Sequence, residues 1–433
     1  MRTFKEKEEG FEMTLFEELE ARGLVEAVTD PEIGKMLEKP LTVYCGFDPS
    51  AASLQAGNLV SIMMLRRLQL AGHRVIALVG GATGLIGDPS GKSAERNMLT
   101  VEKVEENKKG IRENLSRILD FDGPNAAVMV DNYEWYSGLS AIAFLRDVAV
   151  TFRVPQMLAK ESVKKRLEAS EGALTFTEFS YQILQGNDFL HLFDKYGCTL
   201  EVGGADQWGN ITAGTDLVHR MRGKTAYGLT FPLLLDASGK KFGKSEGNAL
   251  FMDASMTSVY DWYQYFLRAA DEDVIRYLKV FSLKPLDEIA ALEAQMKANP
   301  EARIPQKALA EEITLLVHGE AGLKTALGAT QTLFGGSIEG KSADELETIF
   351  KDVKSATLAK AECVGKPGFR VAAAAGMFPS NGEARRMVQQ GGLSLNGAQV
   401  DEGRQFSEGD FIDGRVAVLR SGKKNHFLLR VEG

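Results

Sequence analysis

The fold is decided by one short apolar stretch and the loop that follows it. Residues 41–47 read Leu-Thr-Val-Tyr-Cys-Gly-Phe, a β-favouring run that Asp48-Pro49-Ser50 closes. A helical pattern follows from about Gly57 to Ala71, and residues 74–79 repeat the strand signal before a glycine-rich turn at 80–87. This alternation predicts a parallel sheet covered by helices on both faces, with ligands bound at the carboxyl ends of its strands.

The remainder of the chain changes character about halfway along. Further strands are expected at 126–130 and 198–202, and amphipathic helices at 259–269, 273–280, 306–317 and 343–350. We therefore predict an α/β catalytic domain over 1–245 and an α-helical domain over 246–353. A linker over 354–365 is expected to lead to a small C-terminal domain over 366–433, which contains a basic helix at 383–390.

Composition limits the class of protein. The residues are 44% hydrophobic and 25% charged, which is typical of globular proteins. A chain of 433 residues is longer than a single hydrophobic core usually supports, so more than one domain is expected. The first ten residues lack the apolar core of a signal peptide and no apolar run reaches spanning length, so we expect a cytoplasmic protein that does not enter a membrane. The three scattered cysteines indicate neither a disulfide framework nor a zinc cluster, and we predict no metal ligands.

Charge is unevenly distributed along the chain. The net charge is −8, which at first argues against a nucleic-acid partner. From residue 366 onward, however, 10 Lys and Arg stand against 7 Asp and Glu. The C-terminal segment is therefore predicted to be locally basic, as an RNA-binding module would be.

Two Gly-Lys-Ser triplets, at 91–93 and 243–245, suggest phosphate loops. A P-loop needs a glycine five residues before the second one, and Ile86 and Ser238 occupy those positions. Neither triplet is a P-loop. The segment Lys241-Phe-Gly-Lys244-Ser245 still offers two cations and a hydroxyl on a glycine hinge, which suits a polyanionic phosphate.

Five segments, taken together and in order, resemble the bacterial-type tyrosyl-tRNA synthetase family of class I. They are Tyr44-Cys-Gly-Phe-Asp48-Pro-Ser50 with Leu54-Gln55-Ala-Gly57-Asn58, Gly80-Gly-Ala-Thr-Gly-Leu-Ile-Gly-Asp88, Tyr181-Gln-Ile-Leu-Gln185-Gly-Asn-Asp188, Gly203-Gly-Ala-Asp206-Gln207-Trp-Gly-Asn, and Lys241-Phe-Gly-Lys244-Ser. The resemblance implies a Rossmann-like sheet, an anticodon-binding helical domain and an S-four type RNA-binding domain. It also implies a homodimer that joins L-tyrosine to tRNA(Tyr) through ATP.

The resemblance implies which residues bind tyrosine. Without it, Tyr44 would be interpreted as a strand core residue and Asp188 as a helix-surface acid. With it, both match the residues that bind the phenolic hydroxyl, while Asp88, Tyr181 and Gln185 match acceptors for the ammonium group and Gln207 addresses the carboxylate. Tyr181, Gln185 and Asp188 recur at i, i+4 and i+7, which independently places them on one face of a helix.

ATP is expected to bind with Mg²⁺ as a substrate, with no tightly bound cofactor. By the resemblance its ligands are Cys45, Gly46, Asp48, Gly57, Asn58, Ser61, Gly204, Asp206 and Lys244. The residues expected to act on the reacting phosphates are Ser50, Gln55, Lys92, Arg96, Lys241, Lys244 and Ser245. Such groups position the substrates and stabilise charge, and no side-chain nucleophile is required.

One departure from the family stands out. The family's signature has histidines where this chain has Gln55 and Asn58, which keep amide donors but cannot become cationic. This change leaves open an RNA-binding protein that keeps the synthetase scaffold without catalysis. Another class I synthetase, chiefly a tryptophanyl enzyme, is the nearer alternative because it would share the nucleotide elements, and Tyr44 and Asp188 argue against it.

Overall fold

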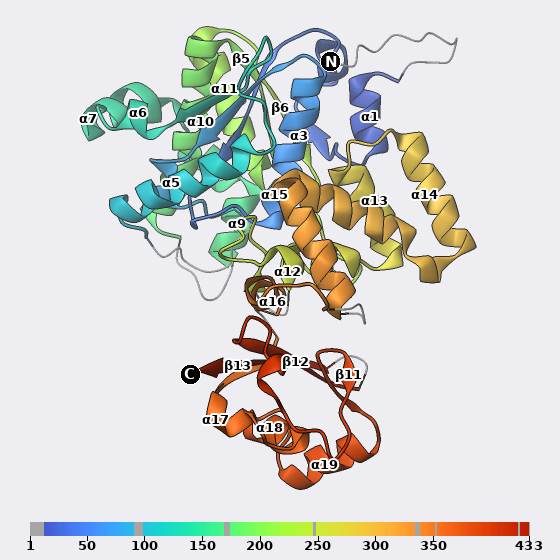
Figure 1. The fold of residues 1–433 in the computed structure, drawn as a ribbon. Coiled ribbons are helices and arrows are strands. Elements are labelled where there is room, and N and C mark those ends of the chain that lie inside the picture. The colour runs from blue at the N-terminus through green and yellow to red at the C-terminus, as the bar shows by residue number, and fades with distance from the viewer. Residues whose placement is uncertain are drawn as a thin grey trace. The chain divides into compact units, whose positions relative to one another are not determined.

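The structure is a computed structural model that describes residues 13–90, 98–168, 174–245, 248–333, 338–350, 353–422 and 425–432. The chain forms two compact units (Figure 1). The first contains the chain up to Ser258 together with Gln264–Val317, and the second contains Val259–Tyr263 and the chain from His318 onward. Among the described residues, no helix has both the length and the apolar character needed to cross a membrane.

A six-stranded sheet forms the centre of the first unit. Its order is β1-β6-β5-β2-β3-β4, and every neighbouring pair is parallel except β1 with β6. The strands are β1 (Ala27–Val28), β2 (Thr42–Phe47), β3 (Arg74–Val79), β4 (Val128–Asp131), β5 (Cys198–Gly204) and β6 (Tyr227–Phe231). The chain leaves β2 toward β3 on one side and leaves β5 toward β6 on the other. This reversal of strand order creates a crevice at the carboxyl ends of β2 and β5.

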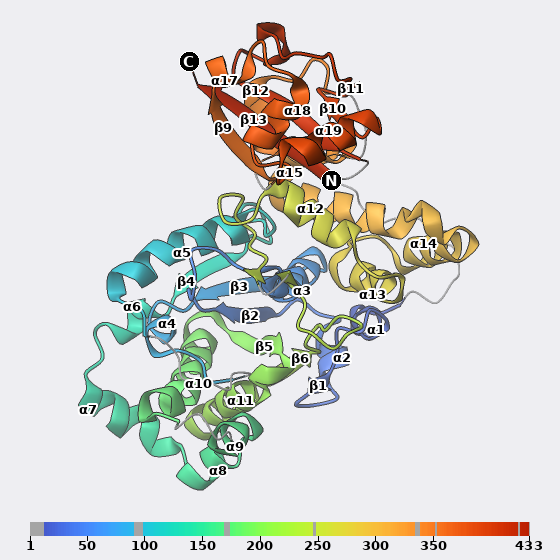
Figure 2. The ribbon, with the colours of Figure 1, turned by 90° about the horizontal axis from the view of Figure 1, so that it is seen from below.

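Helices cover both faces of this sheet. The helices α3 (Leu59–Leu70) and α5 (Val101–Ser116) lie on one face, and α10 (Phe176–Tyr196) and α11 (Trp208–Arg222) lie on the other (Figure 2). Strands covered on both sides read as continuous apolar runs, and β3 is buried at every position after Arg74. The predicted parallel sheet with helices on both faces is confirmed.

The strand predictions at 41–47, 74–79, 126–130 and 198–202 are confirmed within two residues at each end. The sequence reading did not identify β1 or β6. The sequence of β6, Tyr-Gly-Leu-Thr-Phe, is weakened as a strand signal by Gly228. Packing requires that glycine, because a Cβ there would lie 2.2 Å from Cγ2 of Ile211 on α11.

Helices dominate the described residues between Ser258 and Phe350, as predicted. They are α12 (Val259–Leu267), α13 (Asp271–Phe281), α14 (Leu286–Ala298), α15 (Ile304–Leu333) and α16 (Ala343–Ile349). The backbone of α15 is non-helical at Gly319, where φ is 68°. Within the first unit, Arg67 of α3 donates a hydrogen bond of 2.6 Å to the carbonyl of Ser282, which fixes the end of α13 against the sheet domain.

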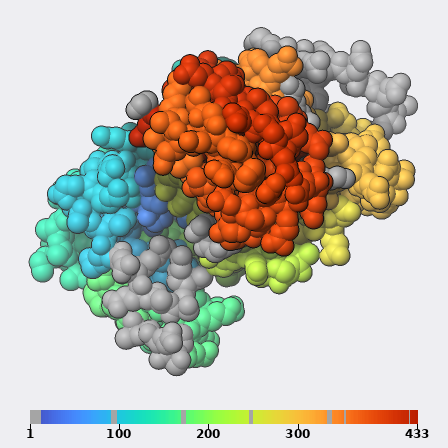
Figure 3. Space-filling model, turned by 60° about the horizontal axis from the view of Figure 1, so that its bottom comes forward, coloured from blue at the N-terminus to red at the C-terminus, as the bar shows by residue number. Residues whose placement is uncertain are grey.

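The second unit contains a five-stranded sheet in the order β11-β10-β12-β13-β9. The strands are β9 (Ser355–Ala359), β10 (Leu393–Leu395), β11 (Ala398–Gln399), β12 (Val416–Ser421) and β13 (Asn425–Glu432). Side chains of β12 alternate between two cores. Val416 and Val418 pack with α16, whereas Ala417 and Leu419 pack with α18 (Gly368–Ala374) and α19 (Asn381–Gln389). The side chains of residues 355–433 that the structure describes are drawn in orange to red in the space-filling view (Figure 3).

The prediction of a linker at 354–365 is wrong. Residues 355–359 form β9, which pairs in parallel with β13, and α17 (Lys360–Cys363) follows it. The strand signal is weak because Ser355-Ala-Thr-Leu-Ala359 is small and polar, and its pairing partner lies more than 60 residues later in the chain. The basic helix predicted at 383–390 corresponds to α19.

Candidate active site

A cavity of about 340 Å³ lies at the carboxyl ends of β2 and β5, where the topology predicts it. The predicted site residues that line it are Tyr44, Cys45, Gly46, Asp48, Ser50, Gly57, Asn58, Ser61, Asp88, Tyr181, Gln185, Asp188, Gly204, Asp206, Gln207 and Lys241. Gln55 and Lys244 are not among the described residues that line it. Lys92 and Arg96 lie outside the described residues, and so does the side chain of Ser245.

One end of the cavity holds a buried phenol and a buried carboxyl group. Asp188 on α10 accepts hydrogen bonds from Nε1 of Trp135 at 2.9 Å and from Nδ2 of Asn132 at 3.0 Å. Burial raises the pKa of Asp188 to about 7. The ring of Tyr44 packs edge-on against Phe189, with 5.2 Å between centroids, and its buried hydroxyl interacts with Glu201 but has no hydrogen-bond partner of ordinary geometry among the described residues. This end can bind a polar ligand group that both donates and accepts hydrogen bonds.

Three hydrogen bonds set the polarity of the adjoining part of the cavity. The Tyr181 hydroxyl donates to Oδ2 of Asp48 at 2.8 Å, and Nε2 of Gln185 donates to Oε1 of Glu201 at 2.9 Å. Since these donors are occupied, the oxygens of Tyr181 and Gln185 remain as acceptors. Nε2 of Gln207 donates to Oδ2 of Asp88 at 2.7 Å. A carboxylate and two neutral acceptors at this place suit an ammonium group.

Helix α10 presents three of these side chains together, as the sequence spacing predicted. Its N-terminus is fixed by a capping box between Thr175 and Glu178. Glu178 also forms a buried ion pair with Arg166 of α9 (Glu161–Glu168), with 2.9 Å between Nη2 and Oε1. The helix ends at Gly197, whose left-handed conformation is typical of glycine. Both ends of α10 are thus fixed, which holds its polar face toward the cavity.

Close backbone approach shapes the opposite end of the cavity. Gly80 follows β3 at a point where a Cβ would lie 2.0 Å from Oδ1 of Asp48. The same carboxyl oxygen accepts a hydrogen bond of 2.7 Å from the Thr83 hydroxyl. Asp206 lies in the turn between β5 and α11, and its pKa is raised by burial and then by the nearby Asp88. Small residues and an acid at this edge leave room for a polar ligand larger than an amino acid.

The first loop meets α3 through Asn58. The backbone N–H of Gln55 donates to Oδ1 of Asn58 at 3.0 Å, and the Asn58 amide nitrogen, which meets no acceptor among the described residues, can donate toward the cavity. The backbone of Gln55 instead bridges to Phe251. The two residues that replace the family's histidines are therefore placed differently with respect to the cavity.

The segment 241–245 lies at the cavity edge. Lys241 and Phe242 line the cavity, and the ring of Phe242 also packs among Tyr265, Tyr277 and Phe281 at centroid distances of 5.4, 4.9 and 5.1 Å. The N–H of Gly243 donates to the Tyr265 hydroxyl at 2.8 Å. Lys244 is exposed and begins β7 (Lys244–Ser245). The aromatic cluster thus anchors a segment that carries two lysines.

Comparison with known proteins identifies the family. Residues 35–335 match the family described as tRNA synthetases class I (W and Y). The chain belongs to this family. Residues 345–429 of the synthetase also match the family described as tyrosine–tRNA ligase SYY-like C-terminal domain.

Relatives of this synthetase cover nearly its whole length. It is 49% identical over 428 residues to a tyrosine–tRNA ligase of Bifidobacterium longum strain DJO10A, covering 96% of this chain and 97% of the relative. It is 46% identical over 429 residues to a tyrosine–tRNA ligase of Opitutus terrae, covering 97% and 100%. Among solved structures, a C-terminally truncated mitochondrial tyrosyl-tRNA synthetase of Aspergillus nidulans is 30% identical with a TM-score of 0.67, covering 75% of this chain and 96% of that one.

One cavity residue of the synthetase was missed by the sequence reading. Glu201 lies within the buried strand β5, accepts the Gln185 hydrogen bond and is only 2% exposed. Its signal was present, because an acid in the middle of Cys198-Thr-Leu-Glu-Val-Gly-Gly204 contradicts the apolar pattern of a covered strand. Trp135 and Asn132, which hold Asp188, gave no comparable signal, because their hydrogen bonds join positions more than 50 residues apart in the sequence.

Proposed function

We propose that this synthetase is a tyrosine–tRNA ligase. It activates L-tyrosine with ATP to give tyrosyl-adenylate and pyrophosphate, and then transfers tyrosine to the 3′-terminal ribose of tRNA(Tyr). The observation that carries the proposal is that the buried Tyr44 and Asp188 line the same cavity as the acceptors Tyr181 and Gln185. The names of the relatives, all tyrosine–tRNA ligases, support the same amino acid.

Tyrosine binding is proposed to use the end that holds Tyr44 and Asp188 together with the part of the cavity that adjoins it. The phenolic hydroxyl reaches Tyr44 and Asp188, and the ammonium group reaches Asp88, Tyr181 and Gln185. Phenylalanine would leave the buried polar atoms of Tyr44 and Asp188 unpaired, and an unpaired buried group costs about 1–3 kcal/mol. Gln207, bonded to Asp88, is placed to address the carboxylate.

ATP is proposed to occupy the opposite end, accompanied by Mg²⁺. Gly46, Gly57 and Gly204 let the backbone approach the nucleotide, and Cys45, Ser61 and Asp206 are the proposed ribose ligands. Asp48 and Asn58 complete this end. The N-terminus of α3 favours the phosphates, because helix N-termini attract anions.

The chemical step needs positioning and charge stabilisation. An oxygen of the tyrosine carboxylate attacks the α-phosphorus of ATP, the bond to the β-phosphate oxygen breaks, and pyrophosphate leaves. Lys241 and Lys244 are proposed to stabilise the charge that develops on the leaving group, with Ser50, Gln55 and Ser245 as further polar contacts. Lys92 and Arg96 are proposed for the same role on the basis of the sequence resemblance alone.

The C-terminal part of the chain is proposed to bind tRNA. In the second unit, Arg385 and Arg386 lie on exposed positions of α19, and Arg420 lies on β12. Arg385 pairs with Glu402 at 2.8 Å, whereas the guanidinium group of Arg386 donates to the carbonyl of Gly382 at 3.4 Å. We retain 246–353 as the proposed anticodon-binding domain and the segment from β9 onward as the proposed S-four type domain.

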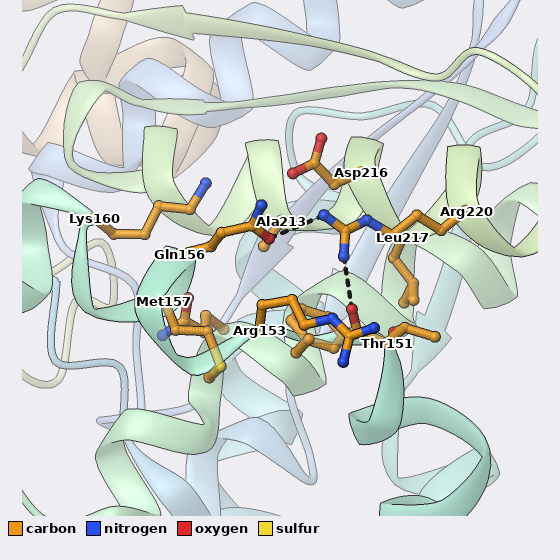
Figure 4. Close-up of a pocket in the computed structure, with 11 residues that line it drawn as sticks. Thr151, Arg153, Gln156, Met157, Lys160, Ala213, Asp216, Leu217 and Arg220 are labelled. Atoms are coloured by element: carbon orange, nitrogen blue, oxygen red, sulfur yellow. Dashed lines mark hydrogen bonds between the residues drawn. The ribbon is translucent and has the colours of Figure 1, made fainter.

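A homodimer is proposed from the surface of the first unit. Five large apolar side chains between residues 142 and 158 are 40–72% exposed: Ile142, Leu145, Val150, Val154 and Leu158. Such a cluster is unusual for a surface that stays in water. Beside it, Arg220 of α11 donates to the carbonyl of Thr151 at 2.7 Å and to Oε1 of Gln156 at 2.9 Å, which fixes this segment against the helix (Figure 4).

Aminoacylation of RNA tests the proposed function. The purified protein is incubated with ATP, Mg²⁺ and bacterial tRNA, and the attachment of each labelled amino acid is measured. We expect tyrosine alone to be attached. Because the reaction consumes ATP and tRNA, we propose that the protein works in the cytoplasm. Attachment of tryptophan would instead identify a tryptophanyl enzyme. RNA binding with no attachment of any amino acid would identify a scaffold protein.

A further inference from the structure

We propose that Glu201 is a positioning residue for tyrosine recognition. It holds the amide of Gln185 with its oxygen toward the cavity, and it donates a hydrogen bond to the Tyr44 hydroxyl, so that the hydroxyl hydrogen of Tyr44 faces the substrate. This inference rests on the proposed tyrosine activity, because it concerns how the same cavity presents donors and acceptors to the amino acid.

Glu201 lies where it can reach both residues. It is the direct neighbour of Tyr44 in the parallel pairing of β5 with β2, and the two side chains line the same cavity. Its exposed fraction is 2% and that of Tyr44 is 1%. On the other side its carboxyl group meets α11 at Gly214, where a Cβ would lie 3.4 Å from Oε2. The carboxyl group is therefore enclosed by β2, α10 and α11.

The bond to Gln185 fixes one carboxyl oxygen as an acceptor. Nε2 of Gln185 lies 2.9 Å from Oε1 of Glu201. An amide nitrogen only donates, so Oε1 accepts and the amide oxygen of Gln185 is the atom left for the cavity. If Glu201 did not hold the amide nitrogen, the Gln185 side chain could rotate by half a turn and present a donor to the substrate ammonium, which would repel it.

The second carboxyl oxygen of Glu201 lies in the same buried region as the Tyr44 hydroxyl. Oε2 of Glu201 and Oη of Tyr44 are both buried without a hydrogen-bond partner of ordinary geometry among the described residues. Two such atoms at paired positions of one sheet face are expected to bond to each other when the cavity is filled. If Glu201 were ionised, Tyr44 would have to donate its hydrogen to Glu201 and would lose it for the substrate.

The surroundings keep the proton on Glu201. The titratable groups that act on it are Tyr44 and Cys45 of β2, Cys198 of its own strand and Asp188 of α10, and none of these is a cation. The positions it meets on α11 and β6, Gly214 and Gly228, carry no side chain. Burial raises the pKa of Glu201 to about 8, so that the neutral form predominates at pH 7.

The result is a directed chain of hydrogen bonds. Glu201 donates from Oε2 to Tyr44, Tyr44 donates to the substrate phenol, and the phenol donates to Asp188. Asp188 is the better final acceptor, because it already receives bonds from Trp135 and Asn132 and its pKa is lower, at about 7. The phenol of tyrosine satisfies both neighbours at once, and phenylalanine satisfies neither.

Two substitutions separate this role from simple space filling. Glu201→Gln keeps an acceptor for Gln185 and a donor for Tyr44 but cannot ionise, whereas Glu201→Met keeps the length and loses both bonds. We expect the KM for tyrosine in pyrophosphate exchange to rise about tenfold or more in Glu201→Met, with a smaller change in kcat, and to stay within about threefold in Glu201→Gln. Equal losses in the two variants would overturn the proposal.

The pH dependence of tyrosine binding gives a readout that packing alone does not move. The dissociation constants of the wild type and of Glu201→Gln are measured by calorimetry from pH 6.5 to pH 9, so that ionisation of the ligand cancels in their ratio. We expect a ratio near one at pH 6.5 and a loss of about tenfold for the wild type at pH 9, one unit above the pKa of Glu201. A ratio that stays constant with pH would overturn the proposal.

Controls keep the outcomes distinct. The exposed Glu38→Gln variant should follow the wild type at every pH, and thermal unfolding establishes that each variant is folded. If Glu201→Met does not fold, the comparison of wild type with Glu201→Gln still decides. If the wild type shows no tyrosine-dependent exchange while remaining folded, the proposed function itself fails, which is a different result from an altered ratio.

Discussion

The hydroxyl of Tyr181 on α10 donates a hydrogen bond to the carboxyl group of Asp48, with 2.8 Å between Oη and Oδ2. This bond joins the helix that carries the proposed tyrosine ligands to the loop that carries the proposed nucleotide ligands. Asp48 also accepts from Thr83 after β3. The two halves of the cavity are therefore connected through a single carboxyl group.

Replacing Tyr181 by Phe removes a hydroxyl that donates to Asp48 and is the proposed acceptor for the ammonium group of tyrosine. We expect the KM for tyrosine to rise by about ten- to hundredfold, because a hydrogen bond to a charged group contributes about 1.5–3 kcal/mol. The measurement is tyrosine-dependent pyrophosphate exchange with saturating ATP. Tyr196→Phe, at the other end of α10, is the matched control, and equal KM values in the two variants would contradict the proposed ammonium site.

Specificity for the phenolic hydroxyl is expected to depend on Tyr44 and Asp188. Tyr44→Phe and Asp188→Asn should each lower the ratio of kcat/KM for tyrosine over phenylalanine by about ten- to hundredfold, because each alters a partner of that hydroxyl. Activity toward phenylalanine itself should change little. Undiminished selectivity in both variants would remove the proposed pocket.

Lys241 is expected to act on the chemical step. Removing a preorganised donor to developing charge typically lowers kcat by about a hundredfold or more. Single-turnover formation of adenylate should therefore slow by that order in Lys241→Ala, while the dissociation constant for tyrosine stays near the wild-type value. Lys240→Ala removes the adjacent exposed lysine, which does not line the cavity, and should leave the rate unchanged. A normal rate in Lys241→Ala would contradict the assignment.

The buried acids make stability depend on pH in a defined direction. Burial raises the pKa of Glu201 to about 8, above its unfolded value near 4.5, so the folded state binds the extra proton between these pH values. Its contribution to stability is fully present below pH 4.5 and is lost as the pH rises to 8, at up to about 1.4 kcal/mol per pH unit. Urea unfolding at pH 5, 7 and 9 should show Glu201→Gln gaining stability relative to the wild type as the pH rises. An opposite trend would show that Glu201 is ionised in the folded protein.

Arg386 and Arg420 of the second unit are expected to contribute to RNA binding and not to tyrosine activation. Arg386→Ala combined with Arg420→Ala should raise the KM for tRNA severalfold and weaken its salt dependence, because backbone contacts contribute affinity through counterion release. Pyrophosphate exchange should be unaffected. Arg415→Ala, which removes an arginine that pairs with Asp344, is the control. Normal charging by the double variant at physiological salt would argue against tRNA binding by these two arginines.

Much of the fold was predictable because its signals are local. The runs at 41–47 and 74–79 became β2 and β3, since strands covered on both faces are apolar throughout. β9 and β6 were not predictable, since β9 forms only by pairing with a strand far along the chain and β6 contains a glycine that α11 requires. The periodicity of a short segment indicates neither the pairing of β9 with β13 nor the packing of β6 against α11.

The candidate site was predictable to the extent that its residues occur in motifs. Tyr181, Gln185 and Asp188 share a helical face, and the structure brings them into one cavity with Tyr44. The motifs do not predict the hydrogen bonds that hold these side chains in place. The acceptor character of Gln185 depends on Glu201, and the burial of Asp188 depends on Trp135 and Asn132, which come from other elements.

Tyrosine-dependent exchange of pyrophosphate into ATP tests the central claim most directly. The purified protein is supplied with ATP, Mg²⁺ and labelled pyrophosphate, and the incorporation of label is compared with tyrosine, phenylalanine, tryptophan and no amino acid. We predict rapid exchange with tyrosine and only background exchange in the other three samples. Exchange that favours tryptophan or phenylalanine, or no exchange with tyrosine by folded protein, would contradict the account.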